Sequence, residues 1–211
     1  MLRKLNSALA IGRSLFHQAK NLRISSRDTP SADALVQRHS HLWGDGIALD
    51  LGCGTMPRNI FGASEIFGVD ILDHGHPQIR QADLARQPIP FADNSIDFCT
   101  AFDLIEHIPR AAERDGKGVL PFIDLMNEIH RVLKPGGFFL HSTPAYPSKQ
   151  AFQDPTHVNF ITEDTFPVYF CKPNLWASSN GYGYGFTGRF ELIDQAWLYH
   201  VSVVSLLKAE K

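Results

Sequence analysis

The chain has 211 residues, of which 44% are hydrophobic and 20% are charged, and its formal net charge is −2. A chain of this length can enclose one hydrophobic core, so we expect one main domain. Every apolar run is shorter than the roughly 18 residues of a membrane-spanning helix. The slight negative charge also argues against a nucleic-acid partner. These observations predict a soluble, cytoplasmic protein.

Positive charge is concentrated at the start of the chain. No acidic residue precedes Asp28, whereas six basic residues do: Arg3, Lys4, Arg13, Lys20, Arg23 and Arg27. A basic segment with leucines at helical spacing either docks on the domain that follows it or lies on a membrane surface. We predict docked cap helices over residues 1–45, followed by the main domain over 46–211, with membrane contact as the alternative.

The remainder alternates short β-type runs with helical or turn segments, which is typical of an α/β protein with a mainly parallel sheet. Pro121 and an apolar stripe predict a helix over residues 120–133, ended by Pro135 and two glycines. Cys53, Cys99 and Cys171 have neither paired spacing nor an even count, so we expect reduced thiols. The predicted strands cover residues 47–51, 66–70, 79–82, 96–101, 138–143, 190–199 and 201–208.

Two connections between predicted strands are short. Pro57 and Gly62 interrupt the first, and the second, "LDHGHPQIR", has no room for a full helix. Both are near the minimum length for joining parallel strands. Further along, residues 177–188 read "ASSNGYGYGFTG", which indicates either a mobile lid or a long turn.

The turn after the first predicted strand contains Gly52 and Gly54, which leave room for a ligand against the backbone. A dinucleotide-binding turn would have a third glycine at position 57, where this chain has proline. Asp70, at the end of the next strand, favours a nucleoside instead, because its carboxylate can accept both ribose hydroxyls. Asp83 ends the third strand in the same way. Isolated aspartates also cap turns or bind backbone amides, and this alternative stays open.

Four motifs between residues 48 and 144 resemble the class I S-adenosylmethionine-dependent methyltransferases, in the methyltransferase type 11-like branch. They read "LDLGCGTMP", "GVDI", "ADLARQPIPFADNSIDFCTAFDLIEHI" and "EIHRVLKPGGFFLHSTP". The resemblance implies a Rossmann-like sheet of seven mostly parallel strands, with a reversed last strand and helices on both faces. It also implies that S-adenosyl-L-methionine binds at Asp50, Gly52, Cys53, Gly54, Asp70, Ile71, Asp83, Leu84 and Phe102, with the ribose on Asp70 and the adenine beside Asp83 and Leu84.

The segment "DLIEH" gives Asp103, Glu106 and His107 the spacing of one helical face. A second segment, "DPTHVNFIT", follows the fifth predicted strand and contributes His157. Two carboxylates with imidazoles suit a divalent ion such as manganese, iron or zinc. The pattern resembles metal-dependent O-methyltransferases of small RNAs and of the ubiquinone pathway, which implies His107 and His157 as bases or ligands. Alternatively, the Glu-His pair caps a helix or lines the pocket.

The signature of enzymes that methylate exocyclic base amines is missing after the fourth predicted strand, where "AFDLIEHI" stands. We therefore predict O-methylation of a hydroxyl on a small molecule or glycan. The alternatives are a cofactor-binding regulatory protein without turnover and an RNA 2′-O-methyltransferase. His141 is expected to pack or to form a hydrogen bond. Aromatic residues that either wall the acceptor pocket or merely pack are Tyr146, Phe152, Tyr182 and Tyr184.

Overall fold

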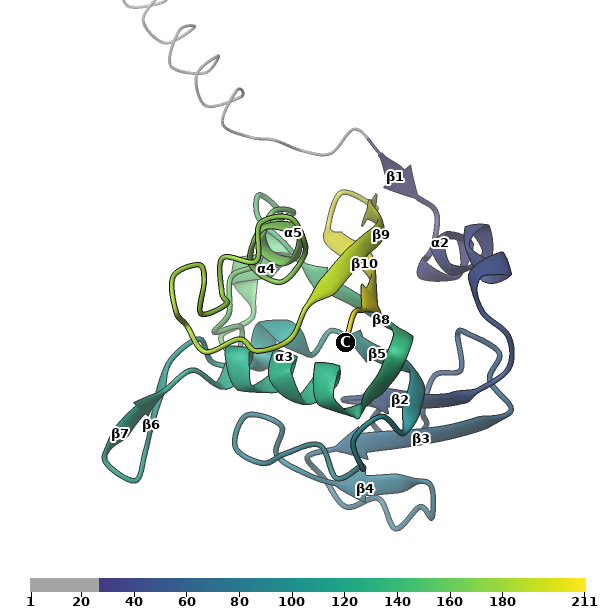
Figure 1. Ribbon diagram of the computed structural model, residues 1–211, viewed down its shortest axis with the longest axis horizontal. Helices are drawn as coiled ribbons and strands as arrows, with labels where there is room; N and C mark the ends of the chain where they lie inside the picture. The colour runs from purple at the N-terminus through teal and green to yellow at the C-terminus, as the bar shows by residue number, and fades with distance from the viewer. Residues whose placement is uncertain (1–26) are drawn as a thin grey trace, which may run out of the picture.

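The computed structural model describes residues 27–211, so most of the basic segment and the helices predicted there lie outside the described residues. Within residues 27–211, eight strands form the main sheet (Figure 1). In spatial order they are β1 (Asp28–Thr29), β9 (Phe190–Leu198), β10 (Ser202–Ala209), β8 (Leu133–Pro144), β5 (Ile96–Phe102), β2 (Ile47–Leu51), β3 (Glu65–Asp70) and β4 (Ile79–Gln81).

The direction of the strands confirms the predicted mostly parallel sheet with a reversed last strand. β4, β3, β2, β5 and β8 pair in parallel, whereas β10 runs antiparallel to both β8 and β9. The strand beyond the predicted seven is β1, which pairs in parallel with β9 over two residues. It falls within the segment that the sequence assigned to cap helices.

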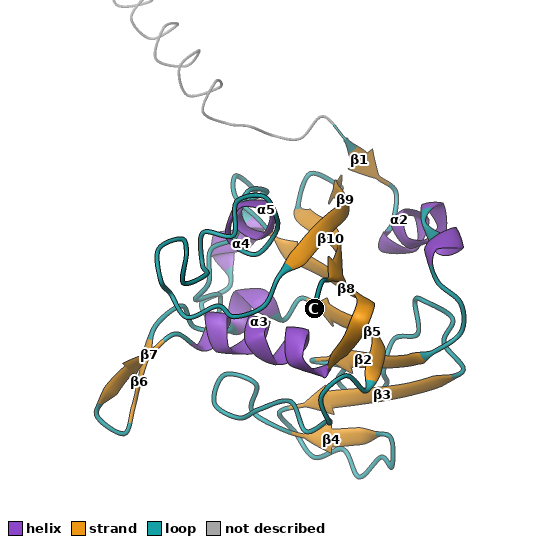
Figure 2. Cartoon of the chain, viewed as in Figure 1, coloured by secondary structure: helices purple, strands orange, loops and turns teal. Residues whose placement is uncertain are grey.

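Helices cover both faces of the sheet (Figure 2). On one face α3 (Pro121–Val132) buries an apolar stripe, with proline at its first turn, and α5 (Thr165–Tyr169) adds Phe166. On the other face α2 (Ala32–Arg38) packs Leu35 and Val36 against the sheet. The Ser31 side chain caps α2 by accepting the Ala34 N–H at 3.0 Å. The shorter helices are η1 (Ser40–Leu42), η2 (Ile105–His107) and α4 (Gln150–Gln153).

A buried carboxylate fixes α2 to the domain. Asp194, on β9, accepts a hydrogen bond from Arg38 at 3.1 Å and lies 2.9 Å from the His39 ring nitrogen Nε2. Burial opposes the ionisation of Asp194, but its bonds to His39 and Arg27 and the charge of Arg38 lower its pKa overall. The described part of the segment 1–45 therefore docks on the sheet.

The two short connections contain no helix over residues 52–64 and 71–78, both of which the structure describes. Aromatic packing takes the place of a helix in the first connection: the Phe61 ring stacks on Phe98 at 4.7 Å, and Trp43 meets Phe61 edge-on at 5.1 Å. A hairpin of β6 (Ala112–Arg114) and β7 (Lys117–Val119) projects from the body beside the start of α3 (Figure 1). Among the described residues, no helix is long and apolar enough to cross a membrane.

The segment 177–188 is a long turn anchored on α3. Phe186 is buried, and Asn127 of α3 donates to the Gly185 carbonyl at 2.9 Å while accepting the Thr187 N–H at 2.8 Å. Tyr182 and Tyr184 remain exposed at the tip of this turn. The anchoring contacts favour the long turn over the mobile lid.

Candidate functional site

The carboxyl ends of β2, β3, β5 and β8 meet at one edge of the sheet, where open α/β folds bind their ligands. The glycine turn follows β2, Asp70 ends β3, and η2 follows β5. The loop that contains His157 follows β8. The segments that the sequence singled out therefore share one edge.

Asp50 fixes the backbone that follows the glycine turn. This buried carboxylate accepts the Thr100 hydroxyl at 2.6 Å through Oδ1 and the Arg58 N–H at 2.8 Å through Oδ2. Burial raises the pKa of Asp50, although both bonds oppose the shift. Gly52 and Gly54 have φ angles of +69° and +60°, which favour glycine. Asp50 thus bonds a backbone amide, as the sequence offered as an alternative, and shapes the turn.

Asp70 closes the turn on the side of β3. One carboxylate oxygen accepts the Gly54 N–H at 2.8 Å, and the other accepts the Leu72 N–H at 3.0 Å and lies 3.2 Å from His74. Burial opposes ionisation, but these bonds to Leu72, Gly54 and His74 lower the pKa of Asp70. An ionised acceptor of this kind fits a ribose, since each oxygen can accept more than one hydrogen bond.

Apolar side chains surround Asp70 at the surface. Ile71 and Leu72 are 60% and 61% exposed, and a Cβ atom at Gly54 would meet no atom within 4 Å. Exposed apolar groups beside an ionised carboxylate and an open turn fit a nucleoside, whose base is flat and whose sugar carries hydroxyls. The residues present therefore fit the cofactor that the resemblance implies.

The other predicted cofactor residues are less open. Asp83 accepts the Ala85 N–H at 3.0 Å and pairs with Arg86 at 3.6 Å, which is the local turn contact offered above as its alternative role. Leu84 is buried in the core. Phe102 ends β5, and the Arg58 guanidinium lies 4.7 Å from the centre of its ring. Cys53 is half-buried, and burial, followed by Asp50 and Asp70, raises the pKa of its thiol to about 11.

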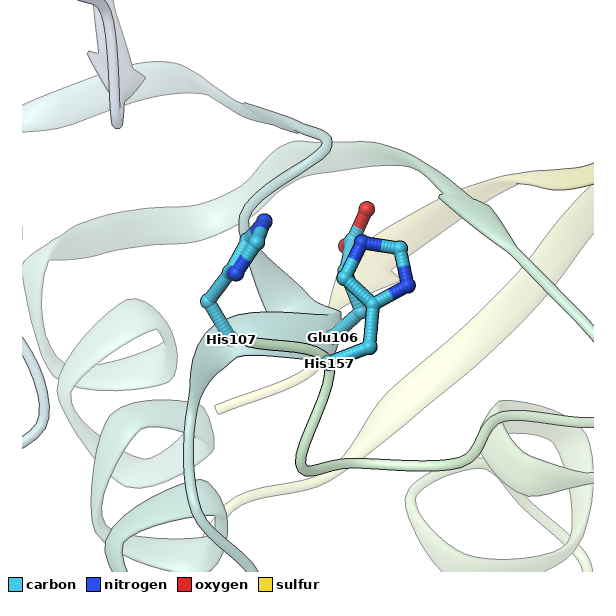
Figure 3. A group of neighbouring side chains, drawn as sticks. All are labelled: Glu106, His107 and His157. Carbon is cyan, nitrogen blue, oxygen red and sulfur yellow. The ribbon is translucent and has the colours of Figure 1, made fainter. Parts of the chain in front are cut away.

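Glu106 is the buried acid of the site (Figure 3). Its Oε2 accepts the Thr143 hydroxyl at 2.7 Å, whereas Oε1 is buried and has no hydrogen-bond partner among the described residues. Burial raises the pKa of Glu106, while the Thr143 bond opposes the shift. A buried carboxylate oxygen without a partner is costly, so it indicates a proton or a ligand at this position.

Two histidines converge on Glu106. The rings of His107 and His157 lie 4.9 Å apart and nearly perpendicular, and the ligand atoms of all three residues fall within 4.8 Å of one another (Figure 3). His157 Nδ1 is buried without a described partner, whereas His107 Nδ1 lies 3.1 Å from the Thr156 hydroxyl. The Glu106 carbonyl accepts the N–H groups of Val158 and Asn159, both at 2.9 Å, and so ties the two loops together.

Asp103 lies outside this cluster, which corrects the predicted four-residue set. The prediction assumed a helix from residue 103 to 107, but Asp103 has a φ angle of +49° and the short 3₁₀ turn begins at Ile105. The helical spacing therefore does not apply to Asp103. Asp154 lies beside the cluster instead, with Oδ2 4.0 Å from His157 Nε2.

A cavity of about 300 Å³ opens beside these loops between α3 and α5. Among the described residues that line it, Arg110 alone is charged, and it donates to the Asn159 side chain at 2.8 Å and also to the Phe160 carbonyl. Of the four predicted aromatic walls, Tyr184 lines the cavity, whereas Phe152 stacks on Phe160 and Tyr146 meets Phe152 edge-on. The lining residues are Arg110, Leu120, Phe122, Ile123, Thr165, Tyr169, Phe170 and Tyr184.

Sequence reasoning missed the residues that support the cluster. Asn159 donates to the Ile105 carbonyl at 3.1 Å and accepts from Arg110, and Thr143 holds Glu106. The usable signal was polarity beside apolar residues, since Thr143 lies three residues after the apolar run that ends at Leu140 and Asn159 lies in "HVNF". His141, also on β8, stacks on Phe166 at 3.7 Å, and both its ring nitrogens are buried without described partners. It packs, as expected, and forms no hydrogen bond with the described residues.

Comparison with known proteins identifies a family for this chain. Residues 24–175, well over half of the chain, match the model of a methyltransferase domain family. Demethylmenaquinone methyltransferases from Listeria welshimeri and Listeria monocytogenes are each 29% identical over 107 residues. The alignments cover 42% of this chain and 41% and 40% of those proteins, so the chain matches about two fifths of the length of these relatives.

Solved structures share the fold. The YcgJ protein of Bacillus subtilis has a TM-score of 0.57 at 13% identity, covering 85% of this chain and 98% of that one. A methyltransferase from Bacillus halodurans has a TM-score of 0.55 at 16% identity, with coverages of 85% and 99%. A SAM-dependent methyltransferase from Aquifex aeolicus has a TM-score of 0.54 at 14% identity, with coverages of 91% and 97%.

Proposed function

Because the chain belongs to the methyltransferase domain family and is a class I S-adenosylmethionine-dependent methyltransferase, we propose that it methylates a hydroxyl group on a small molecule or glycan. The acceptor oxygen is held at Glu106, His107 and His157, and these residues also bind a divalent ion. The observation that carries the proposal is the convergence of one buried carboxylate and two imidazoles at the ligand-binding edge of the sheet.

The three side chains would hold a divalent ion after a small closing movement. Ligand atoms lie about 2.1 Å from such an ion, so two of them are at most about 4.2 Å apart, and the group here spans up to 4.8 Å before any adjustment. The partnerless atoms Glu106 Oε1 and His157 Nδ1 supply one carboxylate and one imidazole ligand. A carboxylate-imidazole set favours manganese, iron or zinc over magnesium.

The reaction needs few protein groups. When bound, S-adenosylmethionine supplies a methyl group on a sulfonium, so transfer forms a carbon–oxygen bond, breaks a carbon–sulfur bond and releases the hydroxyl proton. A bound divalent ion would lower the pKa of the acceptor hydroxyl. An imidazole that binds the ion has no lone pair left for a proton, so with the ion bound the acceptor proton would pass to solvent; without the ion, His107 or His157 would accept it as general base. Thr143 holds the Glu106 carboxylate in position.

The cavity beside Arg110 accommodates the body of the acceptor. Its volume of about 300 Å³ is at the lower end for small-molecule sites. Aromatic rings on α5 and the 177–188 turn, with Phe122 and Ile123 of α3, offer flat apolar walls to an aromatic acceptor or to the apolar face of a sugar ring. Arg110 and Thr165 supply polar groups that orient it.

The test separates metal binding, cofactor binding and transfer. Manganese binding is measured by titration calorimetry on the metal-stripped protein, and transfer is followed with S-adenosylmethionine labelled on the methyl group and a fractionated metabolite and glycan extract. We expect Glu106→Gln and His157→Asn to weaken manganese binding at least tenfold and to abolish labelling. Both variants should bind S-adenosylhomocysteine as the wild type does.

Asp103→Asn is the matched control, because Asp103 is an acid on the same loop but outside the cluster. It should retain manganese binding. Full labelling by the metal-stripped enzyme would refute the requirement for a divalent ion and leave a histidine as a simple general base. Tight cofactor binding with no labelled product in any fraction would instead favour the regulatory protein without turnover, and label in RNA would favour the RNA 2′-O-methyltransferase.

A further inference from the structure

The backbone N–H groups of the glycine turn are already used by the protein. Gly52 and Cys53 donate to the Val69 carbonyl at 2.8 and 3.3 Å, and Gly54 donates to Asp70 at 2.8 Å. In other α/β nucleotide sites, free N–H groups and the start of a helix after the turn bind an anionic group of the ligand. In this chain no helix occurs over residues 52–64. An anionic group placed at this turn needs another donor.

Arg58 lies at the place where that helix would begin. Its backbone N–H is fixed by Asp50 at 2.8 Å, and its guanidinium lies 4.7 Å from the centre of the Phe102 ring at the end of β5. The side chain therefore crosses from the glycine turn toward the neighbouring strand end, over the edge where the ligand binds. Within residues 27–211, no carboxylate forms an ion pair with this guanidinium.

We propose that Arg58 binds the carboxylate of the methionine part of S-adenosylmethionine, in place of the missing helix start. The proposal rests on the cofactor of the proposed function. The guanidinium offers a planar fork of donors that matches a carboxylate, and stacking on Phe102 orients that fork before the ligand arrives. Asp50 orients the turn but cannot bind the carboxylate, because two negative groups would repel each other.

The experiment compares two ligands that differ only in this carboxylate: S-adenosylmethionine and its decarboxylated form. Calorimetry gives the dissociation constant of each for the wild type and for Arg58→Gln. We expect the wild type to prefer the carboxylated ligand by about 10- to 100-fold, the range of a charge-assisted hydrogen-bond pair. In Arg58→Gln this ratio should fall toward 1, with the affinity for the decarboxylated ligand changed less than about twofold.

Two further variants make the result specific. Arg58→Lys keeps the charge but loses the planar fork, so it should give an intermediate ratio. Arg80→Gln is the matched control, because the Arg80 guanidinium also lies over a phenylalanine, 4.0 Å from the Phe91 ring centre, but Arg80 belongs to β4 and not to the glycine turn. It should keep the wild-type ratio.

The outcomes separate this inference from the proposed function. An unchanged ratio in Arg58→Gln, or equal affinity of the wild type for both ligands, would refute the role of Arg58 and leave the cofactor assignment intact. If the wild type binds neither ligand, the cofactor assignment itself fails. Loss of affinity for the decarboxylated ligand in Arg58→Gln would refute the proposal, because it would show that Arg58 supports the turn and does not bind the carboxylate.

Discussion

The two halves of the ligand-binding edge are built differently. Most contacts of the cofactor half join residues no more than 16 positions apart, such as Gly54 with Asp70 and Asp83 with Ala85, although Asp50 also reaches Thr100. The acceptor half depends on contacts between loops about 50 residues apart, such as Glu106 with Val158 and Asn159. Each half has one buried acid, but both oxygens of Asp50 accept hydrogen bonds, whereas Glu106 Oε1 has no partner among the described residues.

This difference means that the two halves should fail separately. A change in the acceptor half should stop transfer without weakening cofactor binding. A change in the glycine turn should weaken cofactor binding without stopping transfer at saturating cofactor. The variants below test that separation, and a variant that harms both functions equally would show that the halves are coupled through the fold.

The largest effect is expected for Glu106→Gln. It removes the only carboxylate in the cluster and keeps the bond to Thr143 within reach. Transfer should fall at least about 100-fold, because the proposed ion loses its carboxylate ligand, while the dissociation constant for S-adenosylhomocysteine stays within twofold. Single-turnover rates and calorimetry measure the two. A parallel loss of cofactor affinity would mean that Glu106 supports both halves.

Gly54→Val should have the next largest effect, now on cofactor binding. The φ angle of +60° is strained for any β-branched residue, and the open space at this Cβ is where the resemblance places the ligand. We expect cofactor affinity to fall at least about 100-fold.

Gly62→Val is the control for Gly54→Val. Gly62 has a φ angle of +69° and equal open space, but it lies beyond the turn. Gly62→Val should lose a similar amount of thermal stability through backbone strain while keeping its cofactor affinity. If both variants lose affinity equally, backbone strain and not ligand contact explains the loss.

Asp70→Ala should weaken S-adenosylmethionine binding by about 1.5 to 3 kcal/mol, because the ribose hydroxyls lose charge-assisted hydrogen bonds. Calorimetry measures the change. Asp73→Ala, at an exposed acid three residues later, is the control and should leave binding unchanged. An unchanged dissociation constant in a folded Asp70→Ala protein would remove the ribose assignment.

The sequence predicted most of the sheet because strand and helix patterns are local. The helix α3 was predicted over 120–133 and observed over Pro121–Val132, since Pro121 and the Pro135-Gly136-Gly137 run fix its ends. β1 was not predicted, because two residues carry no alternation and their pairing with β9 is set by residues about 170 positions away.

The candidate site, like the sheet, could be predicted only where the signal was local. Glu106, His107 and His157 were identified by residue type and place, and the structure brings them together. Asp103 does not join this group, because the prediction assumed a helical spacing where the backbone turns through a positive φ angle. Thr143, Asn159 and Arg110 could not be assigned roles, since their partners lie 37 to 54 residues away.

The smallest effect is expected for His141, which lies beneath α5 on the acceptor side. Burial lowers its pKa to about 3, against an ordinary value near 6.5. The unfolded chain therefore takes up a proton that the folded protein excludes, so stability is full above about pH 6.5 and falls as the pH drops from there toward 3. For one proton, the free energy of unfolding changes with pH by about 1.4 kcal/mol per pH unit.

His141→Leu should remove this slope, because leucine does not titrate and has a similar volume. Urea unfolding between pH 7.5 and pH 5 measures the free energy of unfolding of both proteins. As the pH falls, that of the variant should rise relative to that of the wild type, by about 2 kcal/mol at pH 5. At pH 7.5 the two proteins should have similar free energies of unfolding, because the lost stacking on Phe166 is offset by removal of two ring nitrogens that have no described partner. His200→Asn, at a largely exposed histidine, should leave the wild-type slope unchanged. Identical slopes for His141→Leu and the wild type would show that His141 is reached by water or takes up its proton within the folded protein, so that the packing beneath the acceptor half is looser than the structure indicates.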